Sequence, residues 1–158
     1  MANTNSVIAP SACELAAPLL DAVEEMADEL VRRILSAEHA YAESTLLSTD
    51  QLRGACLANI TEMIGDLAGE RPVDLDAARA AGRLKAEQGV PLAALLHAFR
   101  LGGRLIWEER MTRSDGDASR TLLGMAAQVW ALVDVCSDAA AEAYRISVDT
   151  RAEQDADS

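Results

Sequence analysis

The chain has 158 residues, of which 50% are apolar and 3% are aromatic, and its net charge at pH 7 is −12. This length suits a single domain, and the low aromatic content favours packed helices over a β-sandwich. The negative charge repels nucleic acid and anionic membranes at long range, so it argues against direct DNA binding by this domain.

The N-terminal part of the chain predicts two helices behind a flexible arm. Residues 1–10 are polar and irregular, as is typical of such an arm. Ser11, with Glu14 as its capping-box partner, is expected to open a first helix. Pro18 indicates either a kink or the first turn of a second, longer helix over 18–39, in which apolar residues recur at helical spacing.

Two helices are predicted in the middle of the chain. Ser48 or Thr49 opens one of them after a turn, because hydroxyl side chains suit the N-cap, and Gly69 ends it. Asp74 is expected to cap the next helix, which stops at Gly89. Both glycines follow the last helical turn, where a left-handed residue commonly ends a helix.

Two longer helices complete the predicted fold. Pro91 suits the first position of one helix, which runs to a break at 114–117. The last helix is expected over 118–148, followed by a polar tail or truncated linker at 151–158. Since no segment alternates like a strand, the sequence predicts an all-α fold, a single bundle of five to six helices over 11–150.

Neither a membrane span nor a disulfide framework is expected. No run approaches the roughly 18 uncharged apolar residues that a span requires, and no secretory signal opens the chain, which predicts a cytoplasmic location. The three cysteines, Cys13, Cys56 and Cys136, are far apart and form no CxxC pair. They are predicted to be small packing residues and not metal ligands.

Basic residues gather in one segment of this acidic protein. Residues 79–113 contain seven basic and three acidic residues, a net charge of +4, whereas the rest of the chain carries −16. One of the seven, Lys85, is the only lysine in the protein. On the helix that begins at Pro91, helical spacing places His97, Arg100, Arg104 and Glu108 on one face.

Three glycines in this segment predict close helix packing. Gly102 and Gly103 lie in mid-helix, where each glycine costs about 1 kcal/mol relative to alanine. On the preceding helix Gly82 lies beside Arg79 and Arg83. We expect another backbone, or a ligand, to approach these positions closely.

Three interpretations of the basic residues remain open. They pair with carboxylates of the same chain, such as those of Glu62, Asp66, Asp134 and Asp138; they bind a small anion; or they dock another subunit or a downstream domain. The candidate ligand-binding residues are Arg79, Arg83, His97, Arg100, Arg104 and Trp107.

The same segment carries a family resemblance. The motifs are Gly82-Arg83-Leu84, the run from Glu87 to Leu92, the run from Leu95 to Gly102, and Trp107, with Val133-Asp134, Ser137-Asp138 and Ala143-Tyr144-Arg145 in the last helix. Together they resemble the N-terminal input domains of actinobacterial PucR-type transcription regulators, which are similar to the N-terminal domains of RsbR-type stressosome proteins. The resemblance covers about residues 50–151.

This resemblance implies an all-α fold that is globin-like but lacks haem, a homodimer, and a sensory or regulatory role. Relatives usually carry a C-terminal effector domain, often one that binds DNA. We therefore expect either a piece of a longer regulator with a downstream effector, or a free-standing form that acts on a partner protein.

The residues alone suggest four hypotheses for the function of this domain. A non-catalytic signal-input and dimerisation domain is the leading hypothesis. A haem or metal sensor is disfavoured, because His39 and His97 are the only histidines and His97 shares its face with two arginines. No catalytic motif is present, so no enzyme and no cofactor are predicted. The fourth is a pocket for an apolar molecule, lined by Phe99, Trp107, Met63, Met125 and Trp130.

Overall fold

The computed structural model describes residues 12–43, 46, 48–112 and 119–157. Within them the chain forms α-helices, one 3-10 helix and no strand, which confirms the all-α prediction. The elements are α1 (Ala12–Ala16), the 3-10 helix η1 (Ala17–Ala22), α2 (Val23–Ala37), α3 (His39–Glu43), α4 (Thr49–Leu67), α5 (Asp76–Glu87), α6 (Leu92–Thr112) and α7 (Ser119–Ala156). The predicted arm over 1–10, the Ser11 cap and the break at 114–117 lie outside the described residues.

The N-terminal region is more broken than its pattern predicted. Pro18 lies in the first turn of η1, so the helix expected over 18–39 begins only at Val23. It ends at Ala37, because the backbone of Glu38 is extended, with φ −123° and ψ 101°. After Glu38, residues His39–Glu43 form the separate short helix α3, which carries the buried Tyr41.

The predicted helix ends at Ser48, Gly69 and Gly89 are confirmed, whereas the N-cap of α5 is Leu75 and not the predicted Asp74. The Ser48 side chain accepts a hydrogen bond from the Gln51 amide at 3.4 Å. Gly69 and Gly89 take φ values of +72° and +71°, a left-handed conformation that suits glycine at the end of a helix. Asp74 accepts a hydrogen bond from the amide of Asp76, the first residue of α5, at 2.9 Å.

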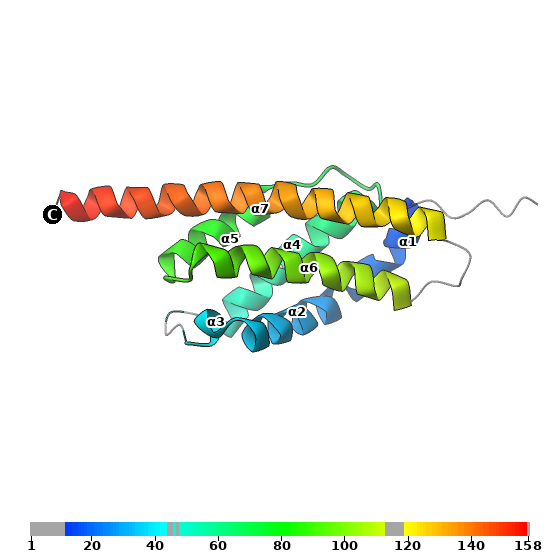
Figure 1. Cartoon of the computed structure of the whole chain (residues 1–158), viewed down its shortest axis with the longest axis horizontal. Coiled ribbons are helices and arrows are strands. Elements are labelled where there is room, and N and C mark those ends of the chain that lie inside the picture. The colour runs from blue at the N-terminus through cyan, green and yellow to red at the C-terminus, as the bar shows by residue number, and fades with distance from the viewer. Residues whose placement is uncertain (1–11, 44–45, 47, 113–118, 158) are drawn as a thin grey trace, which may run out of the picture.

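The last helix is longer than expected. α7 was predicted to end at Val148 but continues to Ala156, so most of the polar tail is helical. Figure 1 shows α7 lying along α5 and α6 and extending past both toward the C-terminus. One reason for the extension is Arg151, which donates hydrogen bonds to the Ala86 and Glu87 carbonyls at 3.2 Å.

The helices enclose one continuous apolar core. α6 lies between α7 and α2, and α4 and α5 cover its other side (Figure 1). Fully buried aliphatic side chains come from all the longer helices and include Ile34, Ile60, Leu95, Ile106 and Met125. No helix in the described part of the chain is both long and apolar enough to cross a membrane.

The cysteines are all free, as predicted. Cys56 and Cys136 are buried in the core, which is where small packing residues are expected. Cys13 is exposed, so the prediction of a packing role is wrong at this position. It lies on short α1 at the edge of the bundle, where neighbouring elements do not enclose it.

Candidate functional site

The basic residues of the 79–113 segment do not form one patch. Arg79 and Arg83 are exposed on α5, and Arg100 and Arg104 are exposed on α6. Arg110 is buried, and Arg113 lies outside the described residues. Spacing within one helix predicts which of its residues share a face, but it does not predict whether that face is buried or lies beside the basic residues of another helix.

The ion pairs also differ from those expected. Arg79 pairs with Asp76 of its own helix at 3.1 Å, and Glu62 pairs with Arg71 at 2.6 Å. Arg83, Arg100 and Arg104 form no ion pair with another described residue. The exposed arginines therefore remain available to a partner.

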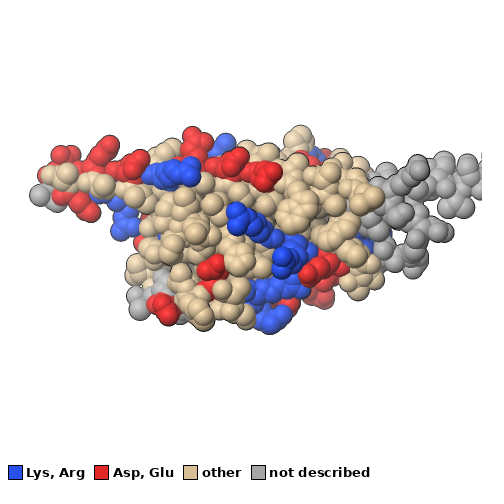
Figure 2. All heavy atoms as spheres, in the orientation of Figure 1, with Lys and Arg blue, Asp and Glu red and all other residues tan. Residues whose placement is uncertain are grey.

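His97 and Glu108, on the predicted polar face of α6, bind α2 and the residue after it. The ring Nδ1 of His97 contacts the Glu38 carboxylate, and Arg33 pairs with Glu108 at 2.7 Å. Figure 2 shows arginine side chains gathered over α2 and α6, whereas acidic side chains predominate along the C-terminal half of α7. The histidine thus has a local carboxylate partner.

A surface groove of about 490 Å³ runs between α5 and α7. Three arginines line it, namely Arg79, Arg83 and Arg151, together with Glu87 and Glu142. Arg151 already binds the end of α5, and the two carboxylates balance much of the remaining charge. Ala139, Ala143 and Ile146 also line the groove, so its surface is of mixed polarity.

Lys85 occupies the core and not the basic surface. Only 2% of the residue is exposed, so its place in the expected basic surface is wrong. Ala78, Ala81 and Gly82 are also buried, and helical spacing places Lys85 on this same inner face of α5. Its Nζ donates to Gln88 Oε1 at 2.9 Å and lies 5.4 Å from the centroid of the Tyr41 ring.

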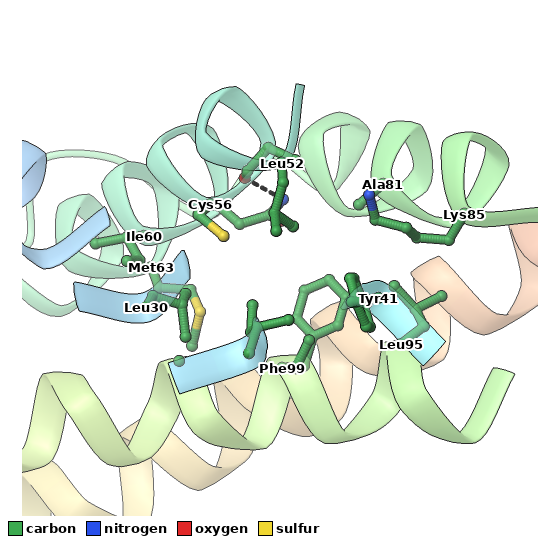
Figure 3. Close-up of a pocket in the computed structure, with 15 residues that line it drawn as sticks. Leu30, Tyr41, Leu52, Cys56, Ile60, Met63, Ala81, Lys85, Leu95 and Phe99 are labelled. Atoms are coloured by element: carbon green, nitrogen blue, oxygen red, sulfur yellow. Dashed lines mark hydrogen bonds between the residues drawn. The ribbon is translucent and has the colours of Figure 1, made fainter. Parts of the chain in front are cut away.

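Beside Lys85 lies a cavity of about 50 Å³. Side chains from helices α2, α3, α4, α5 and α6 line it, and Figure 3 shows Lys85 above Tyr41 and Phe99. Its lining is mostly aliphatic or aromatic, with four polar or titratable side chains: Tyr41, Cys56, Asn59 and Lys85. The amide of Asn59 donates to the backbone carbonyls of Ala55 and Ala77.

Two observations mark this cavity as unusual. The Tyr41 hydroxyl is buried, yet it forms no hydrogen bond with any described residue. Lys85 is buried without a carboxylate within ion-pair distance among those residues. Buried polar groups are normally hydrogen-bonded and buried charges are normally paired. The Tyr41 hydroxyl thus lacks an acceptor, and Lys85, although it donates to the neutral Gln88 side chain, lacks an opposite charge.

Burial shifts the pKa values of the cavity's titratable groups. It lowers the pKa of Lys85 from 10.5 to about 8, a change that the nearby Cys56 partly opposes. It also raises the pKa of the Cys56 thiol to about 12 and that of Tyr41 well above its usual value. The cavity thus holds a protonated thiol and phenol beside an amine that is mostly protonated at pH 7.

The backbone of Lys85 is connected to the last helix through Val90, whose amide donates to the Lys85 carbonyl at 3.0 Å. Gln88, which accepts from Lys85, also donates to Gln51 Oε1 at 3.2 Å. Two residues further on, the Val90 carbonyl accepts from the Tyr144 hydroxyl of α7 at 2.6 Å. Together with the Arg151 contacts, these bonds hold the turn between α5 and α6 from both sides.

The three glycines lie at helix contacts within the chain. A Cβ at Gly82 would stand 2.1 Å from the Ala140 carbonyl oxygen, and one at Gly103 would stand 2.4 Å from Val133 Cγ2. Both neighbours belong to α7. Gly102 borders the cavity, where a Cβ would make an ordinary contact with Leu30 at 3.5 Å.

Comparison with known families matches residues 24–158 to the N-terminal domain of the RsbT co-antagonist protein rsbRD. The chain belongs to this family. The match includes α2 and α3, which the resemblance noted in the sequence did not cover. The similarity to RsbR-type domains is confirmed, whereas the relation to PucR-type regulators and the globin-like character stay predictions. No curated protein and no solved structure matches the chain.

Membership in the rsbRD N-terminal family makes this a regulatory domain. Its cavity differs from the pocket expected from the sequence. Phe99 and Met63 line it, but Trp107 and Met125 do not, and Trp130 is 49% exposed on α7. Trp107 is half-buried and packs against the core. The described residues contain no group of three or more His, Cys, Asp or Glu side chains that could hold a metal ion.

The rsbRD-type domain thus has one feature that the sequence reasoning missed. Lys85 was counted as surface charge, although two signals pointed inward. It is the only lysine, and it follows Ala78 and Ala81 at spacings of seven and four. A search for charged residues on the apolar face of each predicted helix finds it.

Proposed function

We propose that this rsbRD-type domain is a non-catalytic signal-input and dimerisation module of a bacterial stress-signalling or transcription regulator. The observation that carries the proposal is the connection from the cavity to α7. Lys85 donates to Gln88 at the end of α5, the Val90 amide in the following turn donates to the Lys85 carbonyl at 3.0 Å, and Tyr144 of α7 donates to the Val90 carbonyl. Membership in a regulatory family supports the same conclusion.

The path suits transmission because each part has a defined mechanical role. A change at Lys85 alters the hydrogen bond of Gln88, which lies at the end of α5. The turn that follows is bound to α7 by Tyr144 and Arg151. A single continuous helix then passes a displacement on to the C-terminal end.

A homodimer is part of this proposal, and α7 offers the surface for it. Leu123 is 71% exposed and Trp130 is 49% exposed. They are seven residues apart, so they lie on the same face of the helix. Exposed large apolar side chains grouped in this way often mark an interaction site. We infer that a second copy covers this face.

The dimer is tested by the mass of the protein in solution. Light scattering at micromolar concentration is expected to give twice the chain mass, and Trp130→Glu is expected to give a monomer. Ile146→Glu is the control, because Ile146 is also exposed on α7 but lines the groove against α5. A monomeric wild-type protein, or a dimeric Trp130→Glu variant, would contradict the proposal.

The remaining parts of the proposal concern the binding partners of the domain and its location in the cell. The module acts in the cytoplasm on a downstream effector domain or a partner protein, and it binds no DNA directly. Its surface charge supports this last point, since the chain carries −12 overall. Mobility-shift assays with unrelated duplex DNA at low salt are expected to show no complex.

Haem sensing, the alternative, gains no support from the geometry. His97 contacts Glu38, His39 is exposed, and neither lines the cavity of about 50 Å³. A haem group needs far more space than this. An absorbance scan after haem addition is expected to lack a Soret band that depends on His97.

A further inference from the structure

The cavity at Lys85 carries a specific chemical expectation. A buried ammonium group is stabilised by an anion, and the described residues provide no carboxylate for it. The buried Tyr41 hydroxyl is a second donor without an acceptor. Two donors from different helices therefore border one cavity. Lys85 has the neutral Gln88 oxygen as an acceptor but no anion, and the Tyr41 hydroxyl has no acceptor.

The size and walls of the cavity limit the ligand further. A cavity of about 150 Å³ holds a benzene molecule, so one of about 50 Å³ admits a molecule of only a few heavy atoms. Apart from the donors, the walls are largely apolar and include Leu52, Met63 and Phe99. A suitable ligand combines an anionic end with a short apolar end.

We propose that this cavity binds a short-chain monocarboxylate of two to three carbons, whose oxygens accept hydrogen bonds from Lys85 and Tyr41 and whose alkyl end contacts the apolar wall. This inference deepens the proposed function, because it names the chemical class of the signal. Carboxylate binding changes the environment of Lys85 and so acts on the first bond of the path to α7.

The single lysine makes the test direct. Protein labelled with ¹³C at the lysine ε position gives one lysine signal, that of Lys85. Titration with sodium propionate is expected to shift this signal saturably. Propionamide, a neutral molecule of nearly the same shape, and sodium chloride at equal ionic strength are expected to leave it in place.

Variants separate the two donors. Tyr41→Phe is expected to weaken propionate binding about threefold to tenfold, the usual range for one lost hydrogen bond. For Lys85→Leu, the methyl signal of Met63, which lines the same cavity, reports binding, and we expect a loss of about tenfold or more. Arg83→Gln, an exposed change on the same helix, is the control and is expected to bind as the wild type does.

The outcomes divide clearly. A wild-type Lys85 signal that does not shift with propionate, that shifts equally with propionamide, or that never saturates overturns the inference. So does unchanged binding by Lys85→Leu. The wild-type comparison of propionate with propionamide needs no variant to fold. Dimerisation is measured separately, so a dimer that binds no carboxylate overturns this inference and leaves the proposed dimeric module standing.

Discussion

Gly82 and Ala140 bring the backbones of α5 and α7 into direct contact. A Cβ placed on Gly82 would lie 2.1 Å from the carbonyl oxygen of Ala140 and 2.9 Å from its carbonyl carbon. Rotation of a side chain cannot relieve this clash, because the oxygen and carbon that the added Cβ would meet both belong to the backbone of Ala140. This contact sets how closely α7 approaches the helix that carries Lys85.

Gly82→Ala is therefore expected to be strongly destabilising. The two helices must move apart, which reduces the free energy of unfolding by about 3 kcal/mol or more. Gly54→Ala is the matched control, because Gly54 lies on the exposed side of α4 with no atom within 4 Å of its added Cβ. That change is expected to stabilise the protein by about 0.5–1 kcal/mol. Urea unfolding measures both, and equal stabilities would refute the contact.

Gly103→Ala tests the second approach to α7. Its Cβ would lie 2.4 Å from Val133 Cγ2, and valine in a helix has one strongly preferred side-chain rotamer. We expect a loss of about 1–3 kcal/mol in the free energy of unfolding. Adding Val133→Ala should make the double variant more stable than the sum of the single changes predicts, by more than about 0.5 kcal/mol. If the losses in unfolding free energy of the two single variants simply add in the double variant, the clash is not with Val133.

The buried amine predicts a pH-dependent stability. The pKa of Lys85 is about 8 in the folded protein and 10.5 for a solvated lysine, so the unfolded chain holds the extra proton between these values. Folding is therefore penalised by about 3 kcal/mol below pH 8, and this penalty disappears as the pH rises toward 10.5.

The measurement compares Lys85→Met with the wild type. Cys56 and Tyr41 have raised pKa values, so their contributions weaken folding as the pH rises above 9. Both proteins share these two groups, and the difference between them isolates Lys85. We expect the advantage of Lys85→Met in unfolding free energy to shrink by about 2 kcal/mol from pH 7 to pH 9.5. A constant difference would show that the amine titrates normally.

The hydroxyl of Tyr144 is expected to matter for stability, whereas that of Tyr41 is not. Tyr144→Phe leaves the carbonyl of buried Val90 without its donor and should cost about 1–2 kcal/mol of unfolding free energy. Tyr41→Phe removes a hydroxyl that has no partner, so the ligand-free protein should be equally or more stable. Thermal unfolding of the two variants checks this, and the opposite ranking would remove Tyr144 from the path to α7.

Hydrogen exchange provides an independent view of the same path. In Tyr144→Phe the amides after Gln88 are expected to exchange faster, because the α5–α6 turn loses its bond to α7. The amides of α2, which the substitution does not contact, serve as the internal reference. Equal acceleration in both places would indicate general destabilisation and not a local connection.

Local chemistry made several features of this protein readable from the sequence alone. The Ser48 cap and the ends at Gly69 and Gly89 depend on neighbouring residues, and all three are confirmed. The resemblance to RsbR-type domains was also readable from short segments such as Glu87–Leu92, and the family match confirms it. Helix spacing predicted the all-α fold equally well.

Contacts between distant segments decided the rest. Lys85 is inside because α4 and α3 cover the inner face of α5, and the cavity exists because five helices leave a gap that no single pattern describes. Lys85 and Arg110 are absent from the basic surface because packing buries them. α7 continues to Ala156 where Arg151 reaches the end of α5, 64 residues away in sequence. Spacing along one helix fixes which residues share a face, but only packing determines what that face meets.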